Sequence, residues 1–310
     1  MGAPVYTDLN KESDVVRRVR SFLIASFLLG CLAAGAAEPG SGIVVDLERQ
    51  VWFTDSGTGV WRLNGRGEMT LQFKHPAQWL GFDSDGRYSH SKPEFYQRIT
   101  PKGVNPSMLG STSGPIAIGP EGDVYYAASN ESGPLHILRL SPKGERFVVA
   151  QVPDNTKGKK LRKVNGIAVG SDNAIYIVGN HTIRKVTKAG AVSTVAGPLA
   201  SLPDCAPVPG LKKGWQPYMR SITLDNSGVI YAAATGCGLV LRVSPDGQVS
   251  TILQSERGWA PTGVAMFDRD LYVLEYQNAG SDSKRQWVPR VRKLTTDGKV
   301  TVLGTVARTQ

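Results

Sequence analysis

Six times along this 310-residue chain a basic residue stands five positions before a glycine, which indicates an internal repeat. The pairs are Arg62/Gly67, Arg98/Gly103, Arg139/Gly144, Lys185/Gly190, Arg242/Gly247 and Lys293/Gly298. Successive basic residues are separated by 36 residues (Arg62 to Arg98) at the closest and 57 residues (Lys185 to Arg242) at the widest. A similarity that recurs at such a period is typical of a protein built from stacked copies of one structural unit.

The fourth repeat shows the unit most clearly. It contains four short apolar segments with turn residues between them, and we expect strands over residues 165–169, 174–178, 182–186 and 191–196. Four short strands in each repeat are the signature of a β-propeller blade. The sequence therefore predicts an all-β fold, a six-bladed β-propeller of four-stranded antiparallel blades.

The predicted propeller domain spans residues 42–304, and residues 305–310 form a C-terminal tail. We expect its blades over residues 42–73, 79–109, 115–151, 165–197, 219–254 and 262–304. The second strand of each blade carries an aromatic residue that we expect to pack between neighbouring blades: Trp52, Tyr88, Tyr125, Tyr176, Tyr231 and Tyr272. The repeated basic residue has an architectural role in this interpretation, because a contact to one ligand would not recur in every blade.

The first 37 residues differ from the rest of the chain. Arg17, Arg18 and Arg20 precede the uncharged stretch 21–37, which ends in small residues, as in a secretory signal peptide. Two alternatives stay open: a lipoprotein signal that ends before Cys31, which would anchor the protein in a membrane through lipid, and an uncleaved membrane anchor. Each of the three places the propeller outside the cytoplasm, in the periplasm or secreted.

The net charge of +10 could draw the protein to anionic partners such as glycans or lipid headgroups, and a role in solubility alone is the alternative. Nucleic acid is excluded as a partner, because no recognition motif is present and the predicted export leads to another compartment. Beyond Cys31, two cysteines remain, Cys205 before the fifth blade and Cys237 between its second and third strands. Both connections emerge on one face of an up-and-down blade, so we expect a disulfide between them.

The insertions into the repeat gather on that same face. They cover residues 152–164, 197–218 and 277–287 and bring many basic and aromatic side chains. Flat rings beside cations suit stacking on sugars or binding of an anionic ligand. The candidate ligand-binding residues are Lys212, Lys213, Trp215, Tyr218, Arg220, Arg257, Trp259 and Trp287. Anchoring of the long loops onto the propeller is the alternative role for the tryptophans.

Two carboxylates end second strands in blades that meet when the ring closes, Asp55 in the first and Glu275 in the sixth. Paired carboxylates at the channel could hold a divalent ion or share a proton. Asp55, His90 and Glu275 are the candidate catalytic residues, and Asp55, Asn165 and Glu275 are the candidate metal ligands. His181 and Arg220 are further candidates for the channel mouth.

Residues 165–169, 175–177, 182–186 and 190–197 resemble an NHL repeat almost throughout, and Leu241 to Gly247 are similar. This resemblance implies a six-bladed propeller, a fold that hosts many unrelated functions.

The segment Trp52-Phe53-Thr54-Asp55 is similar to one in the senescence-marker-protein/gluconolactonase family, which implies a calcium or zinc ion held by Glu, Asn and Asp in the channel. The chain departs from that pattern. Arg220 stands where the family places an aspartate, and a cation there opposes metal binding. The same segment resembles the streptogramin B lyases, but the matching histidine and glutamate are missing.

The sequence thus favours a binding protein over an enzyme. We expect an exported NHL-like propeller that binds a protein, glycan or small-molecule ligand on its basic, aromatic-rich loop face. The alternative is a metal-dependent lactonase or related hydrolase of the gluconolactonase-like propeller type, with a divalent cation, calcium or zinc, as its cofactor.

Overall fold

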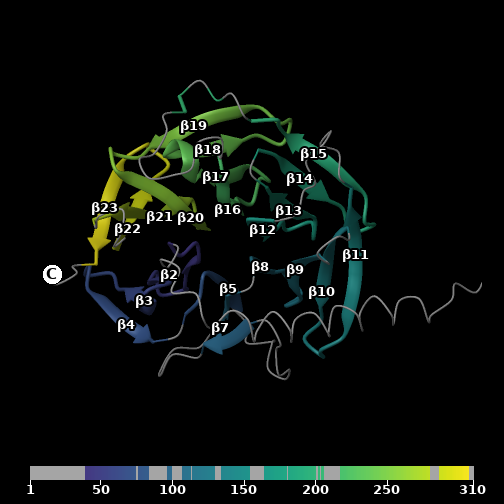
Figure 1. Cartoon of the computed structure of the whole chain (residues 1–310), viewed down its shortest axis with the longest axis horizontal. Coiled ribbons are helices and arrows are strands. Elements are labelled where there is room, and N and C mark those ends of the chain that lie inside the picture. The colour runs from purple at the N-terminus through teal and green to yellow at the C-terminus, as the bar shows by residue number, and fades with distance from the viewer. Residues whose placement is uncertain are drawn as a thin grey trace, which may run out of the picture.

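In the computed structural model, short antiparallel strands form sheets that are arranged in a ring (Figure 1). The structure describes residues 39–74, 76–83, 96–99, 107–112, 114–129, 134–153, 164–179, 181–199, 202, 204–205, 217–279 and 286–306. The predicted signal segment 1–37 and most of the tail lie outside these residues. The described part of the chain contains no helix long and apolar enough to cross a membrane.

Five sheets have four strands each, in the order of the sequence from the channel outward. The first contains β1 (Ile43–Val45), β2 (Val51–Asp55), β3 (Gly59–Leu63) and β4 (Met69–Phe73). The next contains β8 (Ile116–Ile118), β9 (Val124–Ser129), β10 (Leu135–Leu140) and β11 (Arg146–Val152). These two sheets are named the β1 blade and the β8 blade after their innermost strands.

Three further blades follow in the same order. The β12 blade contains β12 (Gly166–Val169), β13 (Ile175–Val178), β14 (Ile183–Val186) and β15 (Val192–Ala196). The β16 blade contains β16 (Met219–Leu224), β17 (Ile230–Ala234), a 3-10 turn (Thr235–Cys237), β18 (Leu239–Val243) and β19 (Val249–Gln254). The β20 blade contains β20 (Trp259–Phe267), β21 (Asp270–Asn278), β22 (Trp287–Leu294) and β23 (Val300–Thr305). The four strands predicted for the fourth repeat are confirmed.

The prediction of six four-stranded blades is wrong, because the second repeat does not form one. Among the described residues it forms a three-stranded sheet of β5 (Trp79–Asp83), β6 (Tyr96–Ile99) and β7 (Ser107–Ser111), in the order β5-β7-β6. Its β7 strand pairs directly with the inner strand and brings Met108 and Leu109, both buried, beside it. The stretch around Tyr88, predicted as the second strand, lies outside the described residues and is mostly polar in sequence, so it lacks the apolar residues that a strand covered on both faces needs.

The innermost strands contact one another in a closed cycle around the channel, in the order β1, β5, β8, β12, β16, β20 and back to β1. Glycines at the starts of these strands allow the close approach. A Cβ atom on Gly42 would lie 2.5 Å from the backbone nitrogen of Leu80, and one on Gly166 would lie 3.0 Å from Cα of Ser221. Larger residues at these two positions would push neighbouring sheets apart.

The repeated basic residue and the repeated aromatic residue face each other across neighbouring strands. Trp52 is opposite Arg62, Tyr176 is opposite Lys185 and Tyr272 is opposite Lys293 in the strand register. In these three pairs the cation lies 5.8, 5.3 and 5.7 Å from the ring centroid. An aspartate completes the group in several blades, as in the ion pairs Arg139–Asp123, Lys185–Asp172 and Lys293–Asp270. The architectural role predicted for the basic residue is therefore confirmed in these blades.

The repeated aromatic residues that the structure describes pack between adjacent sheets, as predicted. Trp52 lies in a cluster with Leu80 and Met108 of the three-stranded sheet, and Tyr176 packs with Ile222 and Ile230 of the β16 blade. The core is thus a series of apolar layers between sheets, which leaves the channel along the axis free for a site.

Candidate functional site

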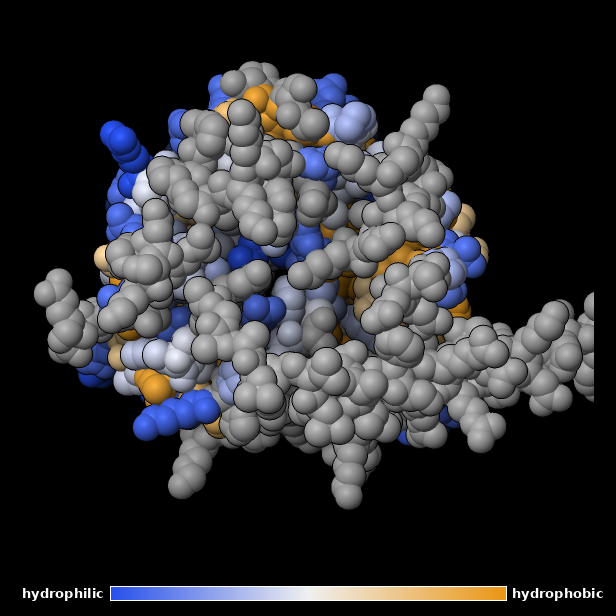
Figure 2. Space-filling view, in the orientation of Figure 1, coloured by the Kyte–Doolittle hydropathy of each residue, from blue (hydrophilic) through white to orange (hydrophobic). Residues whose placement is uncertain are grey.

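A cavity of about 320 Å³ occupies the central channel. All six innermost strands contribute to its wall, mostly with aliphatic side chains such as Val45, Ile118, Ile167 and Leu224. Figure 2 shows hydrophilic residues around the hollow at the centre of the molecule. Inner strands have no further strand on their channel side, so their backbone groups also face the cavity and supply hydrogen-bonding partners. Small-molecule sites commonly have volumes of about 300 to 1,000 Å³, so the channel is large enough for a small ligand.

The residues that open the inner strands form the mouth of this channel. Ser41 precedes β1, Asn165 precedes β12 and Arg220 is the second residue of β16. All three are at least nine-tenths buried. The chain segment Pro39 to Gly42, here called the N-terminal strap, lies against the same mouth, because Nη2 of Arg220 donates a hydrogen bond to the Pro39 carbonyl at 2.7 Å.

Asn165 joins two neighbouring inner strands. Its Nδ2 donates to the carbonyl of Met219 at 2.9 Å, and its own carbonyl accepts a hydrogen bond from Nε1 of Trp79 at 3.3 Å. An amide that donates to the backbone is oriented by that bond. The sequence placed Asn165 at the channel mouth as a candidate metal ligand, and the structure shows it holding adjacent sheets together.

Glu275 lies in a buried ionic cluster between the β16 and β20 blades. Its side chain is fully buried and accepts hydrogen bonds from Nε of Arg290 at 2.6 Å, from Nη1 of Arg292 at 3.3 Å and from the hydroxyl of Ser255 at 2.6 Å. Arg290 also pairs with the exposed carboxylate of Glu256 at 2.9 Å. The Arg290 side chain, by its hydrogen bond and its charge, holds the pKa of Glu256 below its usual value.

The alternation of side chains along β21 explains the direction of Glu275. Tyr276 packs in the cluster shared with the β1 blade and donates its hydroxyl hydrogen bond to the Thr54 carbonyl. Glu275, the preceding residue, therefore points to the opposite face of the sheet, toward Ser255 and Glu256. The Glu275 side chain therefore points away from the β1 blade, which carries Asp55, and this direction opposes the predicted approach of the two carboxylates.

Asp55 ends β2 and is buried. Its carboxylate accepts a hydrogen bond from the Thr58 hydroxyl at 2.6 Å and one from the Gly57 backbone at 3.4 Å, and Thr58 in turn accepts from Nε1 of Trp61 at 2.7 Å. These bonds shape the turn between β2 and β3.

Of the candidate metal ligands, Glu275 does not fit a divalent cation, because two arginines neutralise its carboxylate. The Arg220 guanidinium, which lines the channel mouth, adds a positive charge that opposes metal binding there. Among the residues that the structure describes, no group of three or more His, Cys, Asp or Glu side chains could hold a metal ion.

The aromatic residues predicted for the loop face have packing roles where the structure describes them. Trp259 stacks on Arg290, with the guanidinium carbon 4.0 Å from the ring centroid, and Trp287 packs between the β20 and β1 blades. Tyr218 is buried at the start of β16, and Arg257 is exposed in the turn before β20. His90, Lys212, Lys213 and Trp215 lie outside the described residues. His181 precedes β14, and its carbonyl accepts a hydrogen bond from the Leu199 backbone at 2.8 Å.

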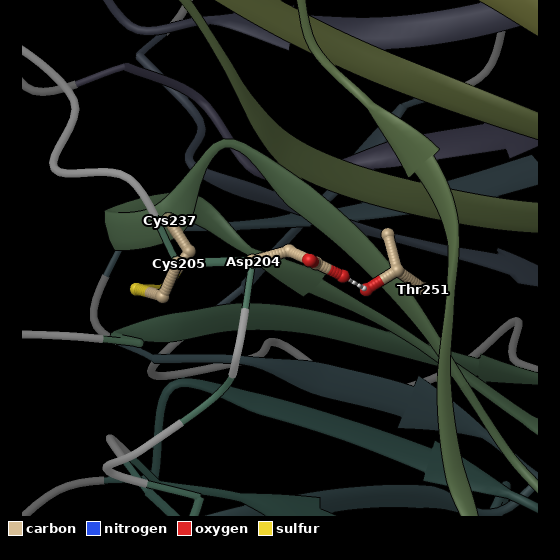
Figure 3. The surroundings of a disulfide bond; sticks show 4 residues. All are labelled: Asp204, Cys205, Cys237 and Thr251. Atoms are coloured by element: carbon tan, nitrogen blue, oxygen red, sulfur yellow. Dashed lines mark hydrogen bonds between the residues drawn. A yellow bond between two sulfur atoms is a disulfide. The ribbon is translucent and has the colours of Figure 1, made fainter.

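The predicted disulfide between Cys205 and Cys237 is confirmed (Figure 3). It ties the connection before the β16 blade to the 3-10 turn after β17, with the two Cα atoms 4.5 Å apart. Beside it, the Thr251 hydroxyl lies 3.5 Å from the carboxylate of Asp204. A disulfide is typical of proteins that fold outside the reducing cytoplasm, which agrees with the predicted export without establishing it.

Sequence reasoning missed the partners of Glu275. A signal was present, because Arg290 and Arg292 alternate within one apolar strand segment and so share a face. Two buried cations on one face require a buried anion nearby, and Glu275 is the residue directly opposite Arg290 in the strand register.

Comparison with known proteins supports the propeller architecture. No family model matches the chain. A stretch of 167 residues is 30% identical to Teneurin-m of Drosophila melanogaster; it covers 46% of this chain and 6% of that protein, so the chain spans a small fraction of the relative's length.

Solved structures of similar shape include a streptogramin B lyase, with a TM-score of 0.51 and 16% identity over 90% of this chain and 86% of the other. A gluconolactonase from Xanthomonas campestris has a TM-score of 0.51 and 14% identity over 83% of this chain and 87% of the other. At these identities the likeness shows the fold, and it does not assign the chain to the NHL repeats.

Proposed function

We propose that this protein is an exported, NHL-like propeller that binds a small-molecule ligand in its central channel. The observation that carries the proposal is the cavity of about 320 Å³, which all six innermost strands line and which has a polar mouth at Ser41 and Arg220. The disulfide supports the export part of the proposal.

The channel replaces the loop face as the proposed binding site, because the tryptophans of the loop face already have packing partners. Trp259 and Trp287, which the sequence offered for ligand stacking, are engaged with Arg290 and with the core between blades. The channel mouth, in contrast, presents polar groups to a cavity, which is the usual arrangement of a small-ligand site.

Blocking the channel tests the proposal. Ala168 lies on the cavity wall, so the variant Ala168→Trp fills the space, whereas Thr301→Trp adds the same side chain at an exposed position of β23. We expect a thermal-shift screen of small organic molecules to find compounds that stabilise the wild type and the Thr301→Trp variant but have no effect on Ala168→Trp. Compounds that stabilise all three proteins equally would place binding elsewhere and refute the channel site.

The alternative, a metal-dependent lactonase, separates from the binding protein by elemental analysis and a lactonase assay. A stoichiometric divalent ion in the purified protein, together with hydrolysis of an aldonolactone that a chelator abolishes, would establish the enzyme. We expect neither, because Glu275 is paired with two arginines and Asp55 accepts a hydrogen bond from the Thr58 hydroxyl.

A further inference from the structure

The outermost strand of the β8 blade departs from the other blades at one exposed position. In each of the five four-stranded blades, one residue of the outermost strand lies opposite the repeated basic residue of the third strand. It is a small hydroxylated residue in four blades, Thr70, Ser193, Ser250 and Thr301, and it is Phe147 in the β8 blade. Phe147 is 41% exposed, and the next residue, Val148, is 43% exposed. Adjacent exposed apolar side chains that the repeat does not require indicate a binding surface.

The Phe147 ring lines a cleft of about 330 Å³ between two blades, here called the rim cleft. Strands β9, β10 and β11 form one wall, and β13 with the turns before it and after β14 forms the other. The turns at its border join first to second or third to fourth strands, so they lie at the blade ends opposite to the disulfide. The rim cleft is therefore separate from the loop face, and its volume is within the range of small-ligand sites.

Arg139 holds the Phe147 ring in place. Its guanidinium carbon lies 4.4 Å from the ring centroid, whereas the repeated cation of three other blades lies over the aromatic residue of the second strand. Nη1 of Arg139 also pairs with the carboxylate of Asp123 at 3.5 Å. A ring that is fixed before binding loses little conformational freedom when a ligand stacks on it, so less of the interaction free energy is lost.

The polar groups around the ring suit a neutral ligand with several hydroxyls. Glu121, Asn173 and Lys188 lie in the turns that border the rim cleft, and Nδ2 of Asn173 donates to the Glu121 carboxylate at 3.3 Å. Together these side chains offer donors and acceptors, and a hydroxyl can pair with either. The charges of Arg139 and Lys188 are balanced by those of Glu121 and Asp123, so the described residues carry no excess charge that would select an ion.

We propose that the rim cleft binds one unit of a neutral glycan, with the apolar face of a pyranose ring stacked on Phe147 and its hydroxyls bonded to Glu121, Asn173 and Lys188. A β-linked glucose unit fits this description, because its equatorial hydroxyls leave both faces of the ring to C–H groups. The inference goes beyond the proposed function, since it assigns a second site, on the rim of the propeller, to a different class of ligand.

Calorimetric titration with cellohexaose, a neutral chain of β-linked glucose, tests the inference. The wild-type protein should bind it, and added salt should leave the affinity unchanged, because screening acts on charges and this sugar has none. Phe147→Ser gives β11 the residue that Ser193 and Ser250 provide in two other blades, so we expect it to fold. Its affinity should fall about tenfold or more, as for the loss of an aromatic anchor. Wild-type protein that does not bind cellohexaose, or Phe147→Ser protein that binds it as tightly, overturns the inference.

Two further variants separate the ring from a general loss of apolar surface. Phe147→Tyr keeps an aromatic ring and should retain most of the affinity. Val302→Ser is the matched control for Phe147→Ser, because Val302 is 47% exposed in the outermost strand of the β20 blade, and it should bind as the wild type does. An equal loss in Phe147→Ser and Val302→Ser overturns the inference.

Filling the rim cleft from its other wall gives an independent check. Ala189 is exposed in the turn after β14 and lines the cleft, so Ala189→Trp should abolish binding of cellohexaose. Arg66→Trp is the control, because Arg66 is exposed and precedes the turn glycine of the β1 blade as Ala189 precedes Gly190. If Ala189→Trp binds cellohexaose as tightly as Arg66→Trp does, the rim cleft is not the site.

The rim cleft and the channel share no lining residue among those described, so the two proposals fail separately. Ala168→Trp, which fills the channel, should leave the affinity for cellohexaose unchanged. A loss of cellohexaose binding in Ala168→Trp but not in Ala189→Trp would place the sugar in the channel and overturn the inference.

Discussion

Replacing Glu275 with glutamine distinguishes a structural carboxylate from a catalytic or metal-binding one. The wild-type carboxylate is fully buried and accepts hydrogen bonds from Arg290, Arg292 and Ser255. In the variant, Arg292 loses its anion and Arg290 keeps only the exposed carboxylate of Glu256. The new amide group must direct either its oxygen or its N–H groups at the two guanidinium groups. Removing one partner of a buried ion pair costs about 3–5 kcal/mol.

A loss of 3 kcal/mol reduces the ratio of folded to unfolded protein by about a hundredfold, since about 1.4 kcal/mol corresponds to a factor of ten. Urea denaturation of the oxidised protein, followed by tryptophan fluorescence, should therefore show a large fall in the midpoint for Glu275→Gln. The matched control is Glu256→Gln, because Glu256 pairs with the same Arg290 but its side chain is 61% exposed. Exposed ion pairs contribute about 0–1 kcal/mol, so the control should shift the midpoint little.

A Glu275→Gln protein as stable as the Glu256→Gln control would refute the ionic cluster. A functional carboxylate in an active site is commonly a source of strain, so its removal would leave stability unchanged or raise it. The double variant Glu275→Leu/Arg290→Met gives a further check, because replacing both partners with apolar groups should cost less than replacing Glu275 alone.

Three more predictions concern the contacts that hold the blades together. Replacing Cys205 and Cys237 together with serine should lower the free energy of unfolding by about 3–4 kcal/mol in the chain-entropy estimate for a loop of this length, measured by urea denaturation; unchanged stability would show that the covalent link restrains the unfolded chain little. Trp52→Ala should destabilise the protein by about 3–5 kcal/mol, because the indole is fully buried between the β1 blade and the three-stranded sheet, whereas Arg62→Ala, which removes the cation beside the same ring, should cost about 1 kcal/mol or less; equal losses would contradict this division. The depressed pKa of Glu256 contributes stability that is present above its unfolded value of 4.5 and is lost as the pH falls through the folded pKa, so Glu256→Gln should flatten the acid limb of a plot of stability against pH; an unchanged limb would contradict the pairing with Arg290.

The repeat could be predicted from the sequence because a basic residue and a glycine recur at the same spacing of five positions. In the five repeats where the structure describes it, the glycine five positions after the basic residue has a positive φ. The values are 82°, 86°, 83°, 87° and 83° at Gly67, Gly144, Gly190, Gly247 and Gly298, and glycine adopts this conformation at low cost. The disulfide could be predicted for a similar reason, since topology alone places Cys205 and Cys237 on one face.

The second repeat could not be predicted, because it keeps the offset between Arg98 and Gly103 while the apolar pattern around Tyr88 is lost. The pairing of β5 with β7 depends on which segment covers the inner strand, and the sequence spacing does not encode that choice. The sequence analysis placed the ligand site on the loop face and named the channel mouth only for the catalytic and metal-binding alternative, so the proposed channel site was not predicted. Directions of Glu275 and Asn165 depend on cross-strand partners, and those become visible only when the register is known.

The most direct test of the channel site is a crystal structure of the protein with a brominated analogue of a compound that stabilises the wild type in the thermal-shift screen, because the bromine can be located by anomalous scattering. We predict a bromine peak between the inner strands, beside residues such as Ile167 and Leu224. A divalent metal ion bound by Asp55 and Asn165, or a bromine peak confined to the outer surface, would contradict it.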